Sequence, residues 1–215
     1  MDNKNKEIKI NGIIINEKNY NEYDKLLTIL TDKLGKISVY AFNVRKTKSK
    51  KLMATNLFTY GLWTLKISND SKYSLYEVSI KKDFFDISKD LDGFYTANYL
   101  LKITDYFNYE NKEADEFLKL LYYSLVAIEK NIVEKELIRR VFELKVLVIE
   151  GLYRDIDRVN YSKTLIYTYE FIINAKIEKL YTFNLKRDVF LEFDKYVENE
   201  YKILIDKRFK YDEYQ

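Results

Sequence analysis

The feature of this sequence that most constrains its fold is a change in hydrophobic periodicity near Lys81. Before that point, short runs of β-branched and aromatic residues alternate with polar ones and are separated by turn signals, which is the pattern of β-strands. After it, apolar residues recur every three or four positions over longer stretches, which is the pattern of amphipathic helices. The sequence therefore predicts an α+β chain with a β-rich front and a helical rear.

The front part contains five candidate strands. They lie at residues 8–15, 24–30, 36–42, 57–68 and 73–80. Asp32-Lys33-Leu34-Gly35 forms a turn signal in which Gly35 can supply a positive φ, and Ser68-Asn69-Asp70-Ser71 forms a second one. This number of strands in so short a segment predicts a small five-stranded OB-fold β-barrel, and a small SH3-like barrel fits the pattern almost as well.

The rear part contains amphipathic runs that predict five or six helices. The runs cover residues 86–107, 115–130, 134–150, 162–175 and about 185–210. Ser162 is a candidate N-cap, and Gly151 is a candidate C′ glycine that ends the third run. We therefore expect a β-barrel domain over residues 1–82 and an α-helical domain over residues 83–215.

The chain has no cysteine and no histidine. Their absence excludes disulfides, Cys/His zinc sites, cysteine nucleophiles and the commonest general base. Any catalysis would have to use Asp, Glu, Lys, Tyr or Ser side chains, and we expect no metal and no cofactor. No apolar stretch reaches the roughly 20 residues that a membrane span requires, and the N-terminus resembles no secretory signal, so we expect a cytoplasmic protein.

A basic stretch at residues 43–52 interrupts the strand pattern. No acidic residue lies between Asp32 and Asp70, so its positive charge is not cancelled nearby in the sequence. The cations of this interval are Lys33, Lys36, Arg45, Lys46, Lys48, Lys50, Lys51 and Lys66. A Lys-rich loop is often simply solvated. This loop, however, lies between strands of a candidate OB barrel, where such folds bind oligonucleotides.

Aromatic residues flank the basic stretch on both sides. Trp63 alternates with Leu65 and Ile67, which predicts a core position for its side chain. Tyr40 and Phe42 lie on the opposite strand face from Val39, so they either stack on nucleic-acid bases or pack against the helical domain. The predicted nucleic-acid-binding residues are Lys36, Tyr40, Phe42, Arg45, Lys46, Lys48, Lys50 and Lys51.

Several stretches resemble the RecO family of bacterial recombinational repair mediators. The opening resemblance rests on residues spaced as in that family's first strands: Asn19-Tyr20, Glu22, Asp24-Lys25, Leu27-Thr28, Thr31, Gly35-Lys36, Ser38, Ala41, Arg45-Lys46 and Lys48-Ser49. In the rear half, RRVFELKVLVIEGLYRDIDR and AKIEKLYTFNL resemble two helical segments of the family. Phe42-Asn43-Val44 stands where the family usually has a glycine, Arg154 where it has proline, and Val159 where it has cysteine.

The resemblance implies an N-terminal OB-fold followed by a helical domain. It also implies binding of single- and double-stranded DNA, annealing of complementary strands, and work with RecR to load RecA onto strands coated by single-strand-binding protein. It implies no enzymatic turnover, and a cytoplasmic, nucleoid-associated location. Many relatives carry a cysteine zinc module after residue 159. Here residues 159–165 run almost directly into the next helical pattern, so the module is expected to be missing.

Besides the DNA-binding mediator, the sequence leaves two other functions open. The second reading is a protein-interaction scaffold that binds the acidic tail of single-strand-binding protein through its helical domain. The candidate protein-binding residues are Arg139, Arg140, Arg154 and Arg158, with Lys145 nearby. The third reading is a metal-dependent nuclease that uses carboxylates, and it rests on the pairs Asp83/Asp86 and Asp155/Asp157, which are common at helix starts and turns.

Overall fold

The computed structural model describes residues 6–47, 49, 51–205 and 209. The chain forms two compact units. The first comprises residues up to Phe85 together with Ile103–Leu118, and the second comprises Asp86–Lys102 and the residues from Lys119 onward. Each unit is described by itself below. The predicted boundary between residues 82 and 83 stays a proposal, because the first unit also contains this later segment of the chain.

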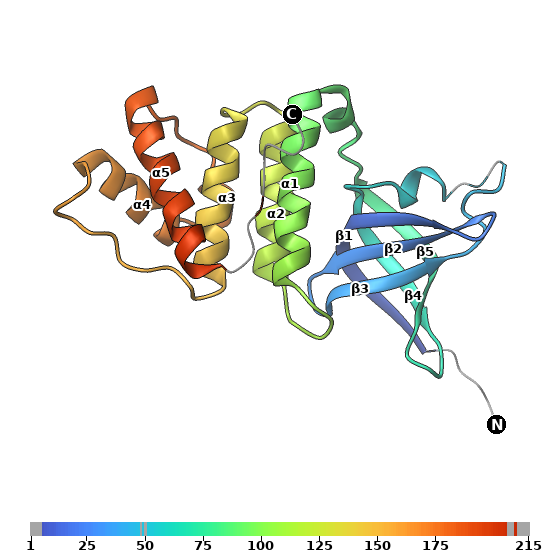
Figure 1. The fold of residues 1–215 in the computed structure, drawn as a ribbon. Helices are drawn as coiled ribbons and strands as arrows, with labels where there is room; N and C mark the ends of the chain where they lie inside the picture. Colours follow the sequence, from blue (N-terminus) through green and yellow to red (C-terminus); the bar gives the residue numbers. More distant parts are fainter. Residues whose placement is uncertain (1–5, 48, 50, 206–208, 210–215) are drawn as a thin grey trace. The chain divides into compact units, whose positions relative to one another are not determined.

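The first unit is built on a closed five-stranded barrel (Figure 1). Its strands are β1 (Lys6–Tyr20), β2 (Asp24–Thr31), β3 (Gly35–Ala41), β4 (Tyr60–Ile67) and β5 (Tyr73–Lys82). They follow the order β1-β2-β3-β5-β4, and all neighbours are antiparallel except β3 and β5. This arrangement is the five-stranded Greek-key barrel of the OB-fold, so the predicted α+β class and barrel type are confirmed.

The barrel interior is filled by the apolar side chains that alternate along each strand. β3 shows the pattern clearly, because Ile37, Val39 and Ala41 are buried while Ser38 is exposed. Trp63 is fully buried in the same core, and its indole Nε1 donates a hydrogen bond to the Gly12 carbonyl at 2.9 Å. The prediction that Trp63 belongs to the core is therefore confirmed.

The turn between β2 and β3 is covered by the connection between the first two helices. Gly35 has a φ of +65°, and a Cβ at this position would lie only 2.2 Å from the carbonyl oxygen of Tyr109. Backbone hydrogen bonds join the two segments: Lys36 N–H to the Tyr109 carbonyl at 3.2 Å, and Asn111 N–H to the Leu34 carbonyl at 2.9 Å. Gly35 is thus required both for the turn and for the close approach of this connection.

Five α-helices follow the barrel in the described part of the chain (Figure 1): α1 (Leu91–Phe107), α2 (Asp115–Glu129), α3 (Lys135–Ile149), α4 (Lys163–Asn174) and α5 (Arg187–Leu204). Short 3-10 turns lie at Met53–Thr55, Phe85–Lys89 and Ile177–Lys179. The predicted caps are present: Ser162 Oγ accepts a hydrogen bond from Leu165 N–H at 3.1 Å, and Gly151, after α3, has a φ of +67°.

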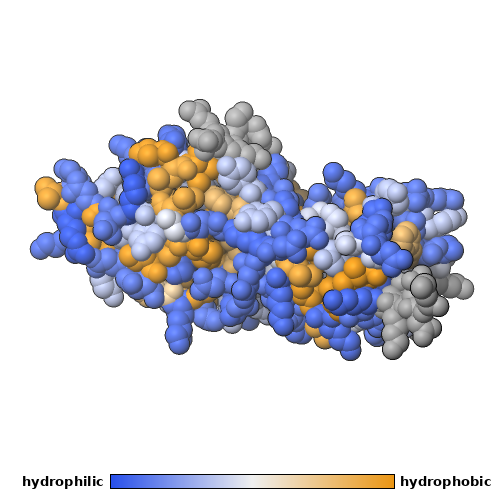
Figure 2. All heavy atoms as spheres, turned by 90° about the horizontal axis from the view of Figure 1, so that it is seen from below, coloured by the Kyte–Doolittle hydropathy of each residue, from blue (hydrophilic) through white to orange (hydrophobic). Residues whose placement is uncertain are grey.

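The surface of the protein is mainly hydrophilic on the face drawn in Figure 2, with hydrophobic residues gathered in patches among the charged ones. Large apolar side chains that are exposed on the helices include Leu91, Tyr167, Leu191 and Ile203. No helix within the described part of the chain is both long and apolar enough to span a membrane.

Candidate nucleic-acid interface

Three aromatic rings form a continuous cluster on the outer surface of the barrel. Tyr40 and Phe42, from the end of β3, have ring centroids 6.0 Å apart and planes only 9° from parallel. Tyr20, at the end of β1, meets Tyr40 edge to face with centroids 5.5 Å apart. Phe42 is 53% exposed and Tyr20 is 42% exposed, so solvent reaches the cluster. We call these three residues the aromatic cluster.

The sequence reasoning identified Tyr40 and Phe42 but missed Tyr20. Extending the predicted first strand beyond Ile15 would have indicated Tyr20, because the longer β1 places this residue opposite Asp24 at the start of β2. Beside the cluster lies Lys72, which forms an ion pair with Asp70 at 2.5 Å. The pKa of Lys72 is raised, chiefly by its hydrogen bond to Asp70 and to a smaller extent by the Tyr40 and Tyr20 side chains, so a cation lies close to the rings.

The basic stretch lies in the connection between β3 and β4, residues 42–59, which we call the basic loop. The first half of this loop is docked onto the tip of the β1–β2 hairpin. The backbone N–H of Asn43 donates to Asp24 Oδ1 at 2.7 Å, and that of Arg45 donates to the Tyr23 carbonyl at 2.9 Å. The Arg45 guanidinium also donates to the Glu22 carbonyl at 3.2 Å, and Lys46 Nζ lies 5.6 Å from the Tyr23 ring centroid. Arg45 and Lys46 are exposed on an ordered backbone, whereas the predicted contacts Lys48 and Lys50 lie outside the described residues.

The second half of the loop is held by two lysines. Lys25, on β2, is buried and donates to the Thr55 carbonyl at 3.1 Å and to Asn56 Oδ1 at 3.2 Å. The Lys51 ammonium donates a hydrogen bond to the Tyr76 carbonyl on β5. The described residues at both ends of the loop are therefore hydrogen-bonded to the barrel.

Lys36 occupies a different environment from the other predicted contacts. Its ammonium lies 2.8 Å from Asp105 Oδ1 and donates to the Asp105 carbonyl at 2.6 Å. The side chain is only 26% exposed, and the carboxylate offsets its charge. As a DNA contact, Lys36 stays a prediction, and its charge is less available than those of Arg45 and Lys46.

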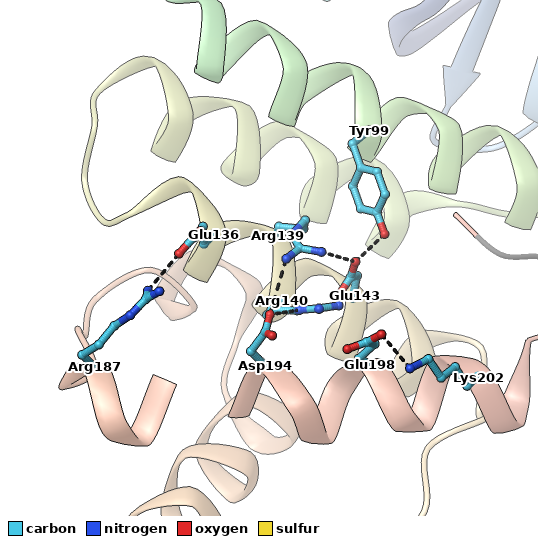
Figure 3. Close-up of polar contacts among 9 residues, drawn as sticks. All are labelled: Tyr99, Glu136, Arg139, Arg140, Glu143, Arg187, Asp194, Glu198 and Lys202. Carbon is cyan, nitrogen blue, oxygen red and sulfur yellow. Dashed lines mark hydrogen bonds and ion pairs between the residues drawn. The ribbon is translucent and has the colours of Figure 1, made fainter. Parts of the chain in front are cut away.

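Arg139 and Arg140 lie in a network of charged side chains that joins α3 to α5 (Figure 3). Arg140 donates to Glu143 Oε2 at 2.8 Å and to Asp194 Oδ1 at 2.6 Å. Tyr99 donates from α1 to Glu143, whose side chain is only 1% exposed. Burial raises the pKa of Tyr99 far above its usual range, and the Glu143 charge raises it further. That the two arginines bind a protein partner stays a prediction. Carboxylates within the helical unit already pair with both charges.

The remaining candidate protein-binding cations also have internal partners. Arg154 forms a two-pronged contact with Glu200, Nε to Oε2 at 3.0 Å and Nη2 to Oε1 at 2.6 Å. Arg158 pairs with Glu170 at the surface. Lys145 is buried and donates to the carbonyls of Ile172, Ile173 and Ala175, where its charge complements the negative end of α4.

The acidic pairs considered for metal binding occupy local structural roles. Asp86 forms an ion pair with Lys89 at 2.6 Å, and Asp157 accepts hydrogen bonds from Val159 N–H and Asn160 Nδ2. These hydrogen bonds lower the pKa of Asp157, with that from the Val159 backbone contributing most. Among the residues that the structure describes, no group of three or more acidic side chains is placed to hold a metal ion.

The barrel surface therefore combines two chemical capacities. Exposed cations on a docked backbone can neutralise phosphates without a large ordering cost, and exposed parallel rings can stack on unpaired bases. Both come from neighbouring parts of the same barrel: β3 ends with Ala41, Phe42 follows directly, and the docked loop begins at Asn43. This arrangement suits a flexible polyanion that carries aromatic groups.

Comparison with known proteins identifies relatives of this chain. The family described as "Recombination protein O N terminal" matches residues 4–84, which cover the barrel strands. The "DNA repair protein RecO" of Caldicellulosiruptor saccharolyticus is 31% identical over 148 residues, 69% of this chain and 60% of that protein. The same-named protein of Clostridium perfringens is 33% identical over 156 residues, 73% of this chain and 63% of that protein.

A third relative, the "DNA repair protein RecO" of Alkaliphilus metalliredigens, is 32% identical over 67% of this chain and 58% of its own length. The chain thus spans about three fifths of the length of these curated relatives. Its 215 residues contain no cysteine, which agrees with the expected lack of a cysteine zinc module. The matched N-terminal segment, the barrel topology and the relatives along most of the chain together place this protein in the RecO family.

Proposed function

We propose that this protein is a DNA repair and recombination mediator that binds DNA through the outer surface of its barrel. It binds single- and double-stranded DNA, anneals complementary strands, and with RecR helps load RecA onto DNA coated by single-strand-binding protein. The observation that carries the proposal is the aromatic cluster of Tyr20, Tyr40 and Phe42 beside a docked basic loop, in a chain of the RecO family.

The mechanism needs binding and no covalent chemistry. Arg45, Lys46 and the neighbouring loop lysines contact phosphates, and Tyr40 and Phe42 stack on bases. Annealing follows because neutralising two phosphate backbones lowers the repulsion between them, while stacking holds unpaired bases extended. Phosphate contacts are independent of sequence, so the protein binds different DNA sequences with similar affinity.

The proposal is tested by the salt dependence of single-strand binding. Each phosphate contact on single-stranded DNA contributes roughly −0.7 to the slope of log affinity against log salt. A triple variant Lys46→Gln, Lys48→Gln, Lys50→Gln is expected to bind more weakly and to reduce the slope by up to about 2. Both quantities are measured by fluorescence anisotropy with a labelled oligonucleotide.

A matched control removes three exposed lysines from the helical unit: Lys163→Gln, Lys176→Gln, Lys179→Gln. It changes the net charge of the protein equally, so it corrects for the general attraction between a basic protein and DNA. An equal loss of affinity and slope in the two triple variants would contradict the assignment of the loop. Annealing of complementary strands, with and without single-strand-binding protein, then tests the mediator role.

A further inference from the structure

The basic loop is held at both ends by two adjacent residues at the start of β2. Asp24 accepts the Asn43 N–H at 2.7 Å, near the beginning of the loop. Lys25 donates to the Thr55 carbonyl at 3.1 Å and to Asn56 Oδ1 at 3.2 Å, near the end of the loop. Because successive residues of a strand point to opposite sides, the dipeptide can reach both ends of the loop at once.

Lys25 cannot act as a phosphate contact itself. Its side chain is 8% exposed, and its ammonium lies 2.5 Å from Glu17 Oε2, so its charge is both buried and offset. The three acceptors around Nζ, from Glu17, Thr55 and Asn56, match the three N–H groups that a lysine can donate. Burying an ammonium costs free energy unless it is paired and hydrogen-bonded, and these three acceptors offset that cost.

We infer that Lys25 is a positioning residue for DNA binding: by fixing the rear end of the basic loop, it limits the conformations from which Arg45 and Lys46 contact phosphates. The inference rests on the proposed binding of DNA by this loop. Without the hydrogen bonds from Lys25, the connection from β3 to β4 samples more conformations, and DNA binding must order it again. Lys25 therefore raises affinity without adding a phosphate contact.

The test uses Lys25→Met in the full chain, because methionine keeps the apolar stem but removes the donor. Three quantities are measured: single-strand affinity, its salt slope, and the rate of tryptic cleavage after Arg45 and Lys46 without DNA. We expect affinity to fall about tenfold, cleavage to accelerate about tenfold, and the salt slope to stay unchanged. Lys46→Gln should instead lower the slope by about 0.7.

A milder variant covers the case in which Lys25→Met does not fold. Asn56→Ala removes one loop acceptor and leaves the Lys25–Glu17 pair and the Thr55 carbonyl in place, so it should reproduce the same changes with smaller size. Thermal melting checks that both variants are folded at the assay temperature. The two variants together separate ordering of the loop from a general loss of stability.

The possible outcomes are distinct. A slope lowered by one contact in Lys25→Met would make Lys25 a direct phosphate ligand and overturn the inference. Faster cleavage with unchanged affinity in a folded variant, or no change in either, would overturn it as well. If the Lys46, Lys48, Lys50 triple variant binds like the wild type, the proposed function of the loop fails instead, while the cleavage assay still reports whether Lys25 orders the loop.

Discussion

The rings of Tyr40 and Phe42 lie nearly parallel, 6.0 Å apart, on the outside of the barrel. Tyr40 also meets Tyr20 edge to face, and Phe42 is 53% exposed. Exposed aromatic rings therefore lie next to the docked start of the basic loop.

Phe42→Ala is expected to weaken binding of single-stranded DNA more than binding of a duplex of the same length. A base stacked on an aromatic side chain contributes about 1–3 kcal/mol, and only unpaired bases offer a free face. The expected loss is therefore about fivefold to 150-fold for the single strand. Affinities for both DNA forms are measured at one salt concentration.

Tyr167→Ala is the matched control, because Tyr167 is 72% exposed on α4 in the other unit. It should leave both affinities unchanged. Equal losses for single strand and duplex in Phe42→Ala would contradict stacking, and they would leave a general effect on the loop as the explanation.

Gly35→Ala and Gly151→Ala should differ in their cost although both glycines have positive φ. At Gly35 a Cβ would meet the backbone of Tyr109 at 2.2 Å, whereas at Gly151 nothing lies within 4 Å. Gly151→Ala should cost about 1–2 kcal/mol for the left-handed conformation alone. Gly35→Ala should cost clearly more, because backbone must move apart.

Urea unfolding of the two glycine variants measures both costs. Hydrogen exchange adds a local reading: amides of Lys36 and Asn111 should lose protection in Gly35→Ala, since both bond across the covered turn. Similar free energies of unfolding for the two variants would show that the Tyr109 connection yields easily.

Arg140→Met should destabilise the helical unit by about 3–5 kcal/mol, because it leaves the buried Glu143 carboxylate without its nearest cation. Arg158→Met removes a surface pair with Glu170 and should cost about 0–1 kcal/mol. Chemical unfolding of both variants measures the difference. Adding Glu143→Gln to Arg140→Met should restore part of the loss, and a failure to restore any would contradict this explanation.

Stability should fall as the pH rises above about 10. Burial raises the pKa of Tyr169 to about 12 and raises that of Tyr181 further. A tyrosine whose pKa is raised in the folded state keeps its proton there while the unfolded chain loses it, so folding is favoured less at each step above the unfolded pKa. Urea unfolding between about pH 8 and pH 11 measures the slope.

Tyr181→Phe is the variant for this test, because its hydroxyl pairs with Ser124 inside the helical unit. It should lower stability at neutral pH through the lost hydrogen bond and make the alkaline decline shallower. An alkaline decline as steep as that of the wild type would exclude Tyr181 as a contributor.

Strand and helix patterns could be predicted because they follow from burial on one face. The predicted third, fourth and fifth helical runs agree with α3, α4 and α5, except that α5 ends at Leu204. β1 extends to Tyr20, five residues past the expected end at Ile15, because the polar segment after the bulge near Asn16 still pairs with β2. Polar residues that pair through the backbone leave no hydrophobic signal in a sequence.

The candidate site could be predicted only as a set of residue types. Charge counting indicates which lysines are present, but it does not distinguish a free ammonium from one that a carboxylate or a carbonyl engages. Lys36 is paired with Asp105, which is distant in the sequence, and Lys25 holds the Thr55 carbonyl, which any residue could supply. Such partners become visible only when the chain is folded.

The cover over the β2–β3 turn has a consequence for the order of events on the ribosome. The five strands are complete once Lys82 has been added, but the segment that bonds to Leu34 and Lys36 comes from residues 109–111. At about 5–20 residues per second, residues 83 to 111 take about 1.5 to 6 seconds to synthesise. The β2–β3 turn therefore stays uncovered during this time, and the segment that covers it is made only after the whole of α1.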